Sequence, residues 1–532
     1  MSAEEINSAP VAAAPAATRP RAASDAVPKD AAVVVLVRGS GEDREVFWAR
    51  RGAALSFQGG FQAFPGGQRD AADAETPVAS CDDAERRAMI ACAARELFEE
   101  TGVLAARGAD SLTRGQLASV LDDFTSGRMT FAGVLAHYGL ALDARDFSFV
   151  GRWVTPPFSP RRFDTWFFLV NCPRKQEPHP LTAEFESGGW ASARAAEASW
   201  LRSEVVAAPP VMHAIRTLAA GLTGDDLVAR FLAVPQARRA AVRRIEFTPG
   251  FVCFPLRTPT RPPATHTNCY LVGRDDFVVI DPGSPYEEEQ AALHACVEEF
   301  VAAARRLREI ILTHHHPDHV GGVEALRAHL GGQVAVAAHR LTAESLGGTV
   351  RVDRFVEDGD EIELAGDPAL LLRAMHTPGH TRGHLSFYEA RTETLITGDN
   401  IVGLGSVLID PPEGDVRAYL ASLGRYRALL PRVRVLYGGH GAAVANPATK
   451  IEEYIAHRLE REANILRAVR GGARTAAEIV ARVYTDVHLK MHALAERAVL
   501  AHAEKLEADA LIVRAAGGEF HPAAGAGGES II

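Results

Sequence analysis

A cluster of side chains that can ligate metals, His314, His316, Asp318 and His319, lies within six positions in the second half of the chain, where Thr313–Gly322 reads THHHPDHVGG. Alternate residues of an extended segment point to the same side, so His314 and His316 can reach one ion together. The chain then turns, which directs Asp318 and His319 toward a second position. Imidazole nitrogens with carboxylate oxygens are typical ligands of Zn²⁺, iron or manganese. The alternative is a His-rich surface loop that binds adventitious metal.

Three later segments each place a further ligand-type residue just after an apolar run. His380 lies in HTPGHTRGH, Asp399 lies in TLITGDN, and His440 lies in LYGGHG. Sites of α/β proteins gather at the carboxyl ends of strands, where these residues are expected. One such residue would more often be a polar group of a loop, but three in addition to the first cluster favour a metal site.

This part of the chain resembles the metallo-β-lactamase superfamily, in particular its glyoxalase II-like and β-lactamase-like endoribonuclease branches. The resemblance implies that a first metal is held by His314, His316 and His380. It implies a second metal held by Asp318, His319 and His440, with Asp399 bridging both. Asp281, in VVIDPG, matches the aspartate that supports the ligand loop of this family without binding metal itself. With every ligand position filled, the resemblance predicts an intact site in which Asp318 is also catalytic.

Two close cations would perform a hydrolysis. They lower the pKa of a bridging water to near 7 and so generate hydroxide as the nucleophile. They also polarise a carbonyl or phosphoryl oxygen and stabilise the developing charge. The motif therefore specifies how water is activated, while a thioester, lactone, ester or phosphodiester would all suit the site.

A second, carboxylate-based pattern lies in the first half, where Arg95–Val103 reads RELFEETGV. On a helix Glu96, Glu99 and Glu100 stand at i, i+3 and i+4 and share one face. Like charges there oppose folding unless a cation neutralises them, and carboxylate-only ligation favours Mg²⁺ or Mn²⁺ and a phosphate substrate. Gly102 is expected to end this helix.

The segment resembles the Nudix box, whose core Arg-Glu-apolar-x-Glu-Glu-x-Gly-apolar is matched completely. Upstream it departs from the family, because Cys81 stands where a glycine is expected and Arg87 where a glutamate is expected. The glycines occur earlier, in FPGGQRD (Phe64–Asp70), which indicates an insertion. This insertion and the segment Thr155–Val170 resemble the coenzyme A diphosphatase branch of Nudix hydrolases.

The resemblance implies that the three glutamates hold Mg²⁺ or Mn²⁺ on a pyrophosphate, with Glu99 catalytic and Arg95 orienting the glutamates. Further candidates for contacts with the substrate are Gly66, Gly67, Arg161 and Arg162. Guanidinium groups suit phosphate oxygens, although both arginines could equally form surface salt bridges. Glu184 or Glu186 would supply another carboxylate, and the sequence does not choose between them.

The surrounding patterns describe the elements that must position these residues. Strand-like apolar runs alternate with helical segments from Ala31 to Arg244, and a second strand-rich pattern follows. The expected fold is a multidomain α/β and α+β protein: a Nudix α/β/α fold, a metallo-β-lactamase αβ/βα sandwich, and a helical, winged-helix-like C-terminal extension. The expected divisions are a disordered leader (1–30), a Nudix-like domain (31–244), a metallo-β-lactamase-fold domain (245–445), a helical, winged-helix-like domain (446–515) and a flexible tail (516–532).

The composition of the chain limits which kinds of partner it is expected to bind. Across 532 residues the formal net charge is −10, which gives no electrostatic footprint for nucleic acid. The six cysteines contain no C-x-x-C pair, which argues against cysteine-ligated zinc and a disulfide framework. Neither a secretory signal nor an apolar run of about 20 residues is visible, so a cytoplasmic protein without a membrane partner is expected. The oligomeric state stays open.

The leading hypothesis is a metal-dependent hydrolase that joins two activities. Its dinuclear site, with two Zn²⁺, iron or manganese ions, would cleave a thioester or ester by metal-bound hydroxide, while a Nudix-type pyrophosphohydrolase acts on a coenzyme A derivative or a nucleotide. The first alternative is an endoribonuclease, which the balanced charges of the helical tail do not favour. The second alternative makes the Nudix part a non-catalytic ligand sensor.

Overall fold

A computed structural model of the chain describes residues 27–55, 58–159, 161–403, 405–485 and 487–523. Most of the expected leader and the end of the expected tail lie outside these residues. Two boundaries differ from the expectation: Lys29 and Asp30 already belong to the first strand, and Phe520–Pro522 forms the last one. Both segments pair with a neighbouring strand, which supplies the backbone hydrogen bonds that hold them.

The N-terminal half is built on a mixed sheet in the order β3-β2-β1-β8-β7, with β4 beside β1 and β9 beside β2. Its central strands, β1 (Lys29–Arg38) and β8 (Phe163–Asn171), run parallel. The other strands are β2 (Glu45–Arg51), β3 (Gln62–Ala63), β4 (Gly66–Gln68), β7 (Ser148–Val154) and β9 (Phe185–Ser192). A separate small pair joins β5 (Val78–Ala79) to β6 (Leu142–Asp143).

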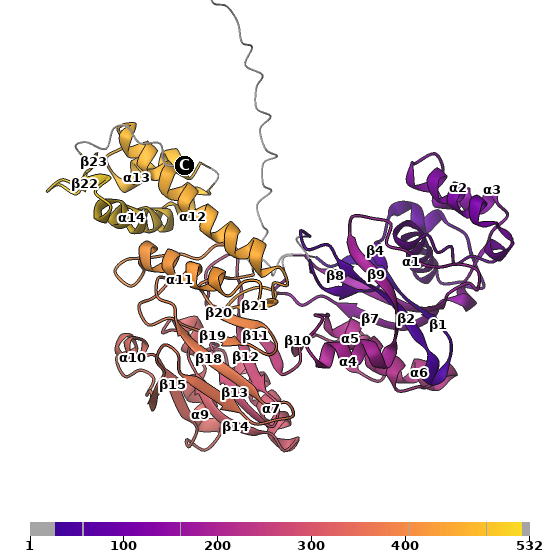
Figure 1. Cartoon of the computed structure of the whole chain (residues 1–532), viewed down its shortest axis with the longest axis horizontal. Coiled ribbons are helices and arrows are strands. Elements are labelled where there is room, and N and C mark those ends of the chain that lie inside the picture. The colour runs from indigo at the N-terminus through magenta and orange to yellow at the C-terminus, as the bar shows by residue number, and fades with distance from the viewer. Residues whose placement is uncertain (1–26, 56–57, 160, 404, 486, 524–532) are drawn as a thin grey trace, which may run out of the picture.

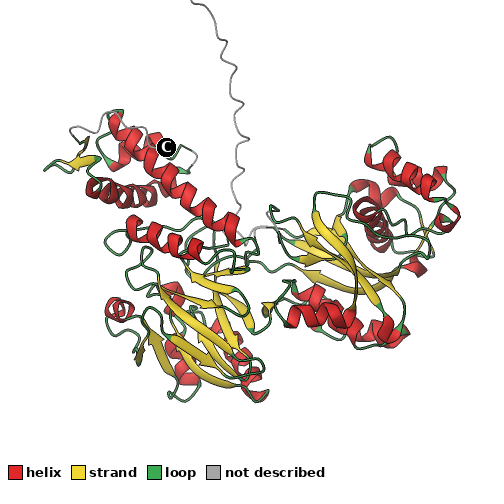
Figure 2. Cartoon of the chain, viewed as in Figure 1, coloured by secondary structure: helices red, strands yellow, loops and turns green. Residues whose placement is uncertain are grey.

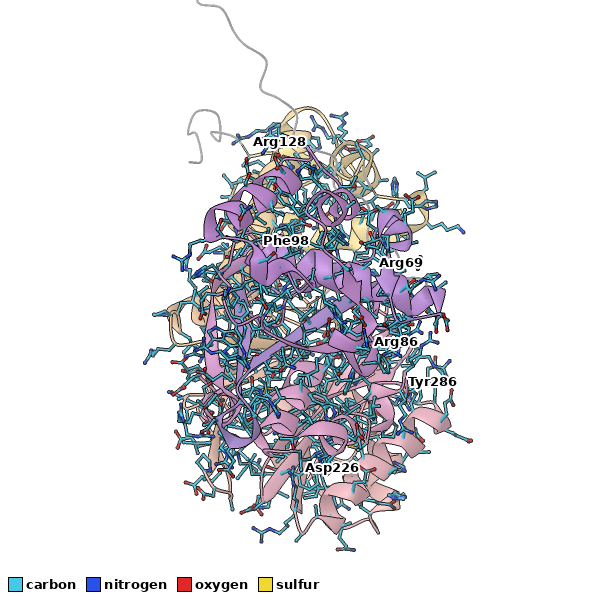
Figure 3. All side chains as sticks on the ribbon, turned by 90° about the vertical axis from the view of Figure 1, so that its right-hand side faces the viewer. Arg69, Arg86, Phe98, Arg128, Asp226 and Tyr286 are labelled. Atoms are coloured by element: carbon cyan, nitrogen blue, oxygen red, sulfur yellow. The ribbon has the colours of Figure 1, made fainter. Side chains whose placement is uncertain are left out.

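Helices cover both faces of this sheet (Figure 1), which explains the unbroken apolar sequence of β1. Val34 and Leu36 face the core beneath α1 (Ala84–Thr101), whereas Val35 and Val37 face the opposite core. Figure 3 looks onto this half and labels Phe98 of α1. The opposite core contains α4 (Ala193–Leu201), α5 (Pro209–Ala219) and α6 (Gly224–Phe231). Helices α2 (Arg114–Thr125) and α3 (Phe131–His137) follow α1 and pack in the first core.

The second half contains two sheets packed face to face (Figure 2). The first has the order β10 to β16 and the second the order β17 to β21. The first comprises β10 (Ile245–Thr248), β11 (Phe251–Arg257), β12 (His266–Gly273), β13 (Asp276–Ile280), β14 (Arg306–Ile311), β15 (Ala335–Ala338) and β16 (Arg354–Phe355). The second comprises β17 (Glu361–Leu364), β18 (Leu370–His376), β19 (Leu385–Glu389), β20 (Thr394–Gly398) and β21 (Val435–Gly438).

Helices flank the outer face of each sheet, so this half is the four-layered αβ/βα sandwich expected from the sequence. Outside the first sheet lie α7 (Glu287–Ala302), α9 (Val323–His329) and α10 (Arg340–Leu346). Outside the second lie α11 (Val416–Ala428) and the first turns of α12 (Pro447–Arg470). Alternating strand residues supply both cores: Ile396 faces the other sheet, while its neighbour Leu395 faces α11.

The strands also fix where the ligand-type residues emerge. β14 ends at Ile311 and leads into the short helix α8 (Pro317–Val320), β20 ends immediately before Asp399, and β21 ends two residues before His440. Because β20 and β21 are parallel neighbours, their carboxyl ends meet at one edge of the sheet. The fold thus delivers residues from distant parts of the sequence to one place.

The C-terminal region contains α12, α13 (Ala476–Val483), α14 (His492–Ala508) and the hairpin of β22 (Ile512–Arg514) and β23 (Phe520–Pro522). It has its own apolar core, yet α12 is shared. Ile451 and Tyr454 pack beneath the second sheet, whereas Ile465 and Val469 belong to the C-terminal core. Among the described residues no helix is long and apolar enough to cross a membrane.

The two halves of the chain share a packed apolar contact. Phe61 and Phe158 of the N-terminal half are buried in the cluster that lies between the two C-terminal sheets. The ring of Phe61 meets Phe247 edge-on, with centroids 5.2 Å apart. The indole N–H of Trp200 donates to the Phe247 carbonyl oxygen at 2.9 Å. The contact between the two halves is therefore part of a buried hydrophobic core.

Replacing Phe61 by Ala is expected to lower stability by about 3–5 kcal/mol, because a fully buried aromatic ring is lost from this core. Phe355→Ala is the matched control, since its ring is 56% exposed and its loss should change stability by less than about 0.5 kcal/mol. Chemical unfolding followed by tryptophan fluorescence measures the difference. Equal effects of the two substitutions would contradict the packing described.

Candidate metal centre

The structure brings seven ligand-type side chains from four separate segments together at the edge of the sandwich. They fall into two groups whose ligand atoms lie within 4.8 Å of one another. The first group is His314, His316, His380 and Asp399, and the second is Asp318, His319 and His440. These are the seven residues that the sequence singled out, and Asp399, expected from the resemblance to bridge the two metals, falls in the first group.

Within the groups the polar atoms face one another at short range. Nδ1 of His316 lies 3.0 Å from Nε2 of His314 and 3.0 Å from Nε2 of His380. Asp399 stands between the groups, with Oδ2 3.7 Å from Nε2 of His380 and 3.3 Å from Nε2 of His440. Its Oδ1 lies 3.4 Å from Nε2 of His319. One carboxylate therefore lies close to nitrogen atoms of both groups, as a bridging ligand must.

The outer nitrogens of four imidazoles already have partners. Nδ1 of His380 donates to the Leu408 carbonyl oxygen at 2.9 Å, and Nδ1 of His440 donates to the His266 carbonyl oxygen at 2.8 Å. Nδ1 of His319 lies 2.8 Å from Oδ2 of Asp281, and Nδ1 of His314 lies 3.0 Å from the hydroxyl of Thr313. With the proton on the outer nitrogen, Nε2 presents a lone pair inward, as a metal ligand must.

Two inward atoms test whether a cation fits. Among the described residues, Nε2 of His319 and Oδ1 of Asp399 are buried without a hydrogen-bond partner, although buried polar atoms are normally paired. Both atoms face the space between the two groups. An imidazole nitrogen and a carboxylate oxygen, 3.4 Å apart, are both of the ligand types that divalent cations bind.

The protonation of each histidine in the site depends on burial and on the charges of its neighbours. Burial, reinforced by neighbouring imidazoles, lowers the pKa of His316 to about 2 and holds the pKa of His314 well below its ordinary value. Burial also opposes the charged form of His319, but the surrounding carboxylates, Asp399 first, raise its pKa well above the ordinary value. The first group is therefore neutral imidazole, and the second surrounds its imidazoles with negative charge.

Asp281 holds the ligand segment in place, as the resemblance implied. Its Oδ1 accepts from the backbone N–H of Thr313 at 2.8 Å, and its Oδ2 accepts from the Thr313 hydroxyl at 2.6 Å. The same Oδ2 accepts from His319. A buried carboxylate with three donors orients both the start and the end of the ligand cluster.

Close packing at the site explains one of the glycines in LYGGHG. A Cβ atom on Gly439 would lie 2.1 Å from Oδ1 of Asp399 and 2.9 Å from Cε1 of His319. A side chain at this position would displace a ligand atom from each group. Sequence reasoning read the motif for its histidine and missed this requirement for space.

Sequence reasoning also missed His384, which is fully buried behind the bridging carboxylate. Its Nε2 accepts the backbone N–H of Asp399 at 3.1 Å, and its Nδ1 lies 3.1 Å from the Thr377 hydroxyl. The signal was present as the last histidine of HTPGHTRGH, four residues after His380. His384 positions Asp399 through its backbone and contributes no atom to either ligand group.

The three glutamates of the N-terminal half lie on α1 as expected, and Gly102 ends that helix with φ 74°. Among the described residues, however, they form no group at ligand distance. Arg95 draws Glu96 to 2.8 Å and Glu99 to 3.5 Å, while the backbone N–H of Gly66 donates to Glu100 at 2.7 Å. The carboxylates are thus fixed by protein partners, with Glu99 the most exposed.

The partner of Arg95 in the inserted loop was not foreseen. Asp73, buried in a short 3-10 helix (Ala71–Glu75), accepts from Nε and Nη2 of Arg95 at 2.8 and 3.0 Å. Arg87, at the position where the family has a glutamate, donates instead to the carbonyl oxygens of Cys81 and Asp82. The inserted loop therefore supplies a buried carboxylate that holds Arg95.

The other predicted contacts are spread around this half. Gly67 packs against Glu96, since a Cβ there would lie 2.6 Å from the carboxyl group. Arg162 donates to the Thr155 carbonyl oxygen at 3.0 Å, and Arg161 is exposed. Glu184 and Glu186 pair with Arg51 and Arg50. Glu184 also contributes to raising the pKa of Glu100, behind burial and Glu96.

Family models match three parts of the chain. Residues 262–440 match the metallo-beta-lactamase superfamily, residues 81–218 match the NUDT19 Nudix domain, and residues 475–519 match the beta-lactamase associated winged helix domain. The chain joins a Nudix domain to a metallo-β-lactamase domain. Both are hydrolase families that bind divalent metals, and the chain is a hydrolase of this combined type.

Curated relatives match the metallo-β-lactamase domain. The Beta-lactamase-like protein 2 homolog of Caenorhabditis elegans is 28% identical over 222 residues, which is 41% of this chain and 71% of that protein. The atrochrysone carboxyl ACP thioesterase of Aspergillus chevalieri is 29% identical over 234 residues, 42% of this chain and 68% of that protein.

Solved structures match each domain separately. A metallo-beta-lactamase family protein from Thermus thermophilus is 23% identical with a TM-score of 0.42, covering 52% of this chain and 99% of its own. A NUDIX hydrolase from Alicyclobacillus acidocaldarius is 32% identical with a TM-score of 0.34, covering 39% of this chain and 96% of its own.

Asp281→Ala in the metallo-β-lactamase domain should weaken binding of one of two Zn²⁺ ions by roughly 10–100-fold, because His319 loses its outer acceptor. Competition with a chelator, using Zn²⁺ alone, measures the affinity. Asp276→Ala is the control, since this buried aspartate at the start of β13, the strand that ends just before Asp281, pairs with Arg306 and Arg308. Unchanged affinity in Asp281→Ala would contradict the role given to Asp281.

In the Nudix domain, cation binding should strengthen as pH rises from 6 to 8. Burial, opposed by Arg95, raises the pKa of Glu96 to about 7, so below that pH its carboxyl group is protonated and cannot ligate. Calorimetric titration with Mg²⁺ should show roughly tenfold weaker binding at pH 6 than at pH 8. Glu96→Gln should weaken the pH dependence and leave the part carried by Glu100, whose pKa burial also raises; an unchanged dependence in that variant would contradict the assignment to Glu96.

Proposed function

We propose that the metallo-β-lactamase domain hydrolyses a thioester or ester at a two-metal centre, and that the Nudix domain is a Mg²⁺- or Mn²⁺-dependent pyrophosphohydrolase. The observation that carries the first part is Asp399, which faces both ligand groups, while its Oδ1 and the Nε2 of His319 are buried without a hydrogen-bond partner among the described residues. First-row cations such as Zn²⁺, iron or manganese suit this set of nitrogen and oxygen donors.

Each group has a distinct task in this proposal. His314, His316 and His380 would hold one cation, Asp318, His319 and His440 the other, and Asp399 would bridge them. When bound, two such ions supply an activated water and polarise the substrate oxygen. The chain fixes the ligands beforehand through Leu408, His266, Asp281 and Thr313, which receive the outer hydrogens of the imidazoles.

Asp318 is the proposed proton acceptor. Its Oδ2 receives a hydrogen bond from the Thr267 hydroxyl at 3.3 Å and lies 3.5 Å from Nε2 of His440. It is only partly buried, so it can meet a substrate and a water that enter the site. Thr267 would hold the carboxylate in orientation while Oδ2 takes the proton of the attacking water.

A thioester is favoured over RNA by two observations. Relatives of the metallo-β-lactamase domain include proteins named as acyl-carrier-protein thioesterases. In the C-terminal region, several basic side chains are already paired with carboxylates: Lys505 with Glu462 at 2.9 Å, and Arg514 with Glu507 at 2.9 Å. Paired cations offer little to a phosphate backbone. A coenzyme A derivative would suit both domains, since it combines a thioester with a pyrophosphate.

In the proposed Nudix site, Glu96, Glu99 and Glu100 would hold the cation, with the partly exposed Glu99 placed to meet the substrate. Arg95 holds Glu96 and Glu99 from one side and is itself held by Asp73. A cation would compete with Arg95 for these carboxylates. Gly66 and Gly67 form the adjoining backbone, and Arg161 offers an exposed guanidinium for phosphate.

Asp318→Asn should lower hydrolysis of acyl-coenzyme A thioesters by roughly 10²–10⁴-fold, because a proton acceptor is lost at the attacking water. Glu99→Gln should leave that activity unchanged and abolish release of phosphate products from free coenzyme A or nucleoside diphosphate derivatives. Each variant is assayed on thioester, pyrophosphate and single-stranded RNA substrates, together with metal analysis.

The same set of variants and substrates distinguishes the alternative functions. RNA cleavage lost only in Asp318→Asn would favour the endoribonuclease. Pyrophosphate cleavage equal to background in wild type and Glu99→Gln, with a ligand still shifting the melting temperature, would make the Nudix domain a sensor. No change in any activity and no stoichiometric metal would overturn both catalytic assignments.

A further inference from the structure

The segment that follows the proposed bridging aspartate, residues 401–403 and 405–412, contacts two of the ligand residues, His380 and His440. It begins two residues after Asp399 and contains no helix or strand in its described part. Its Leu408 carbonyl oxygen accepts from Nδ1 of His380 at 2.9 Å, and the backbone N–H of Gly403 donates to the His440 carbonyl oxygen at 2.7 Å. An irregular segment therefore decides where His380 presents its inward nitrogen.

Side chains of two C-terminal helices bind the backbone of this segment. The Tyr454 hydroxyl of α12 accepts from the N–H of Val402 at 3.2 Å and donates toward the carbonyl oxygens of Val402 and Gly405 at 3.1 and 3.2 Å. One turn later on the same face, a guanidinium N–H of Arg458 donates to the Val407 carbonyl oxygen. Val407 immediately precedes the residue that supports His380.

The second helix holds the far end of the segment. Nε of Arg497, on α14, donates to Oδ1 of Asp410 at 2.5 Å, and its Nη2 donates to the Pro411 carbonyl oxygen. Leu408 thus lies between one arginine contact at the preceding residue and another two residues later. Both flanks of the supporting carbonyl are fixed by residues from outside the sandwich.

The burial of Arg458 argues that its contact is more than packing. Its side chain is 5% exposed, and among the described residues no ion pair joins it to a carboxylate. A buried guanidinium is costly to desolvate, so an apolar residue would serve better if only packing were needed. Its observed contacts are the Val407 carbonyl oxygen and the face of Tyr419, whose ring centroid lies 5.1 Å away.

Helix α12 connects this contact to the C-terminal unit as a whole. Figure 1 shows it as one continuous helix that runs from the sandwich to α13 and α14. Its first turns pack in the core beneath the second sheet, and its last turns pack in the C-terminal core. The position of Arg458 and the docking of α14 therefore depend on the same rigid element.

We propose that α12 and α14 clamp the segment after Asp399, with Arg458 and Arg497 as positioning residues that set the Leu408 carbonyl against His380. The clamp raises the affinity of the His314, His316 and His380 group for its cation. The winged-helix-like unit would then support the metal centre of the same chain. This inference rests on the metal centre proposed above.

The test uses the full-length chain and Zn²⁺ alone as the probe. Arg458→Met should weaken the binding of one of the two Zn²⁺ ions by about 10–100-fold, because the Leu408 carbonyl is no longer held. Competition with a chelator measures this affinity. Hydrogen exchange of the amides in residues 401–412 should speed up in the same variant. Arg458→Lys, which keeps a donor for Val407, should recover part of the affinity.

Arg461→Met is the matched control. Arg461 lies three residues further along α12, but it donates to the Val483 carbonyl oxygen and packs on Tyr484, so its contacts stay within the C-terminal unit. It should leave both Zn²⁺ affinities and the exchange of residues 401–412 unchanged. Arg497→Met provides a second, more exposed variant in case Arg458→Met does not fold.

The outcomes separate the clamp from the metal centre. Wild type with no stoichiometric Zn²⁺ would overturn the metal centre and the clamp with it. Two tightly bound ions in wild type, with unchanged affinity and exchange in folded Arg458→Met and Arg497→Met, would overturn the clamp alone. Equal weakening in Arg461→Met would also overturn it, because the effect would then come from general loosening of α12.

Discussion

Polar atoms that converge in a buried place must find an opposite charge or a hydrogen-bond partner, and the metallo-β-lactamase domain is organised around one such convergence. Five imidazoles and two carboxylates meet at the edge of the sandwich. In the part of the chain that the structure describes, the inward nitrogen of His319 and one oxygen of Asp399 have no hydrogen-bond partner. Leaving them so would cost the folded state a desolvation penalty for each atom, and divalent cations would remove it.

The sandwich and the supporting bonds are what make this convergence specific. The strands bring the ligand-bearing loops to one edge, but strand ends alone would leave the imidazole rings free to rotate. Carbonyl oxygens, Asp281 and Thr313 occupy the outer nitrogens and so orient the inner ones. The Nudix domain uses a different solution, in which Arg95 and a backbone N–H hold the carboxylates that a cation would otherwise bind.

Much of this could be predicted from the sequence because the decisive residues are close together or follow apolar runs. The cluster at His314–His319, the residues Asp399 and His440 after their strands, and the glutamate face of α1 were all visible as local patterns. What could not be predicted depends on contacts between distant segments. The Leu408 carbonyl and Asp73 carry no motif, and nothing in the sequence of α12 indicates that Arg458 reaches Val407.

The central claim is that two cations bind between these groups and share Asp399. The most direct measurement is a crystal structure of the metal-reconstituted full-length chain, with anomalous scattering collected at the metal edge. The account predicts two peaks, one within bonding distance of His314, His316 and His380, the other within bonding distance of Asp318, His319 and His440, with Asp399 contacting both. A single ion, or ions bound elsewhere while these side chains pair only with one another, would contradict it.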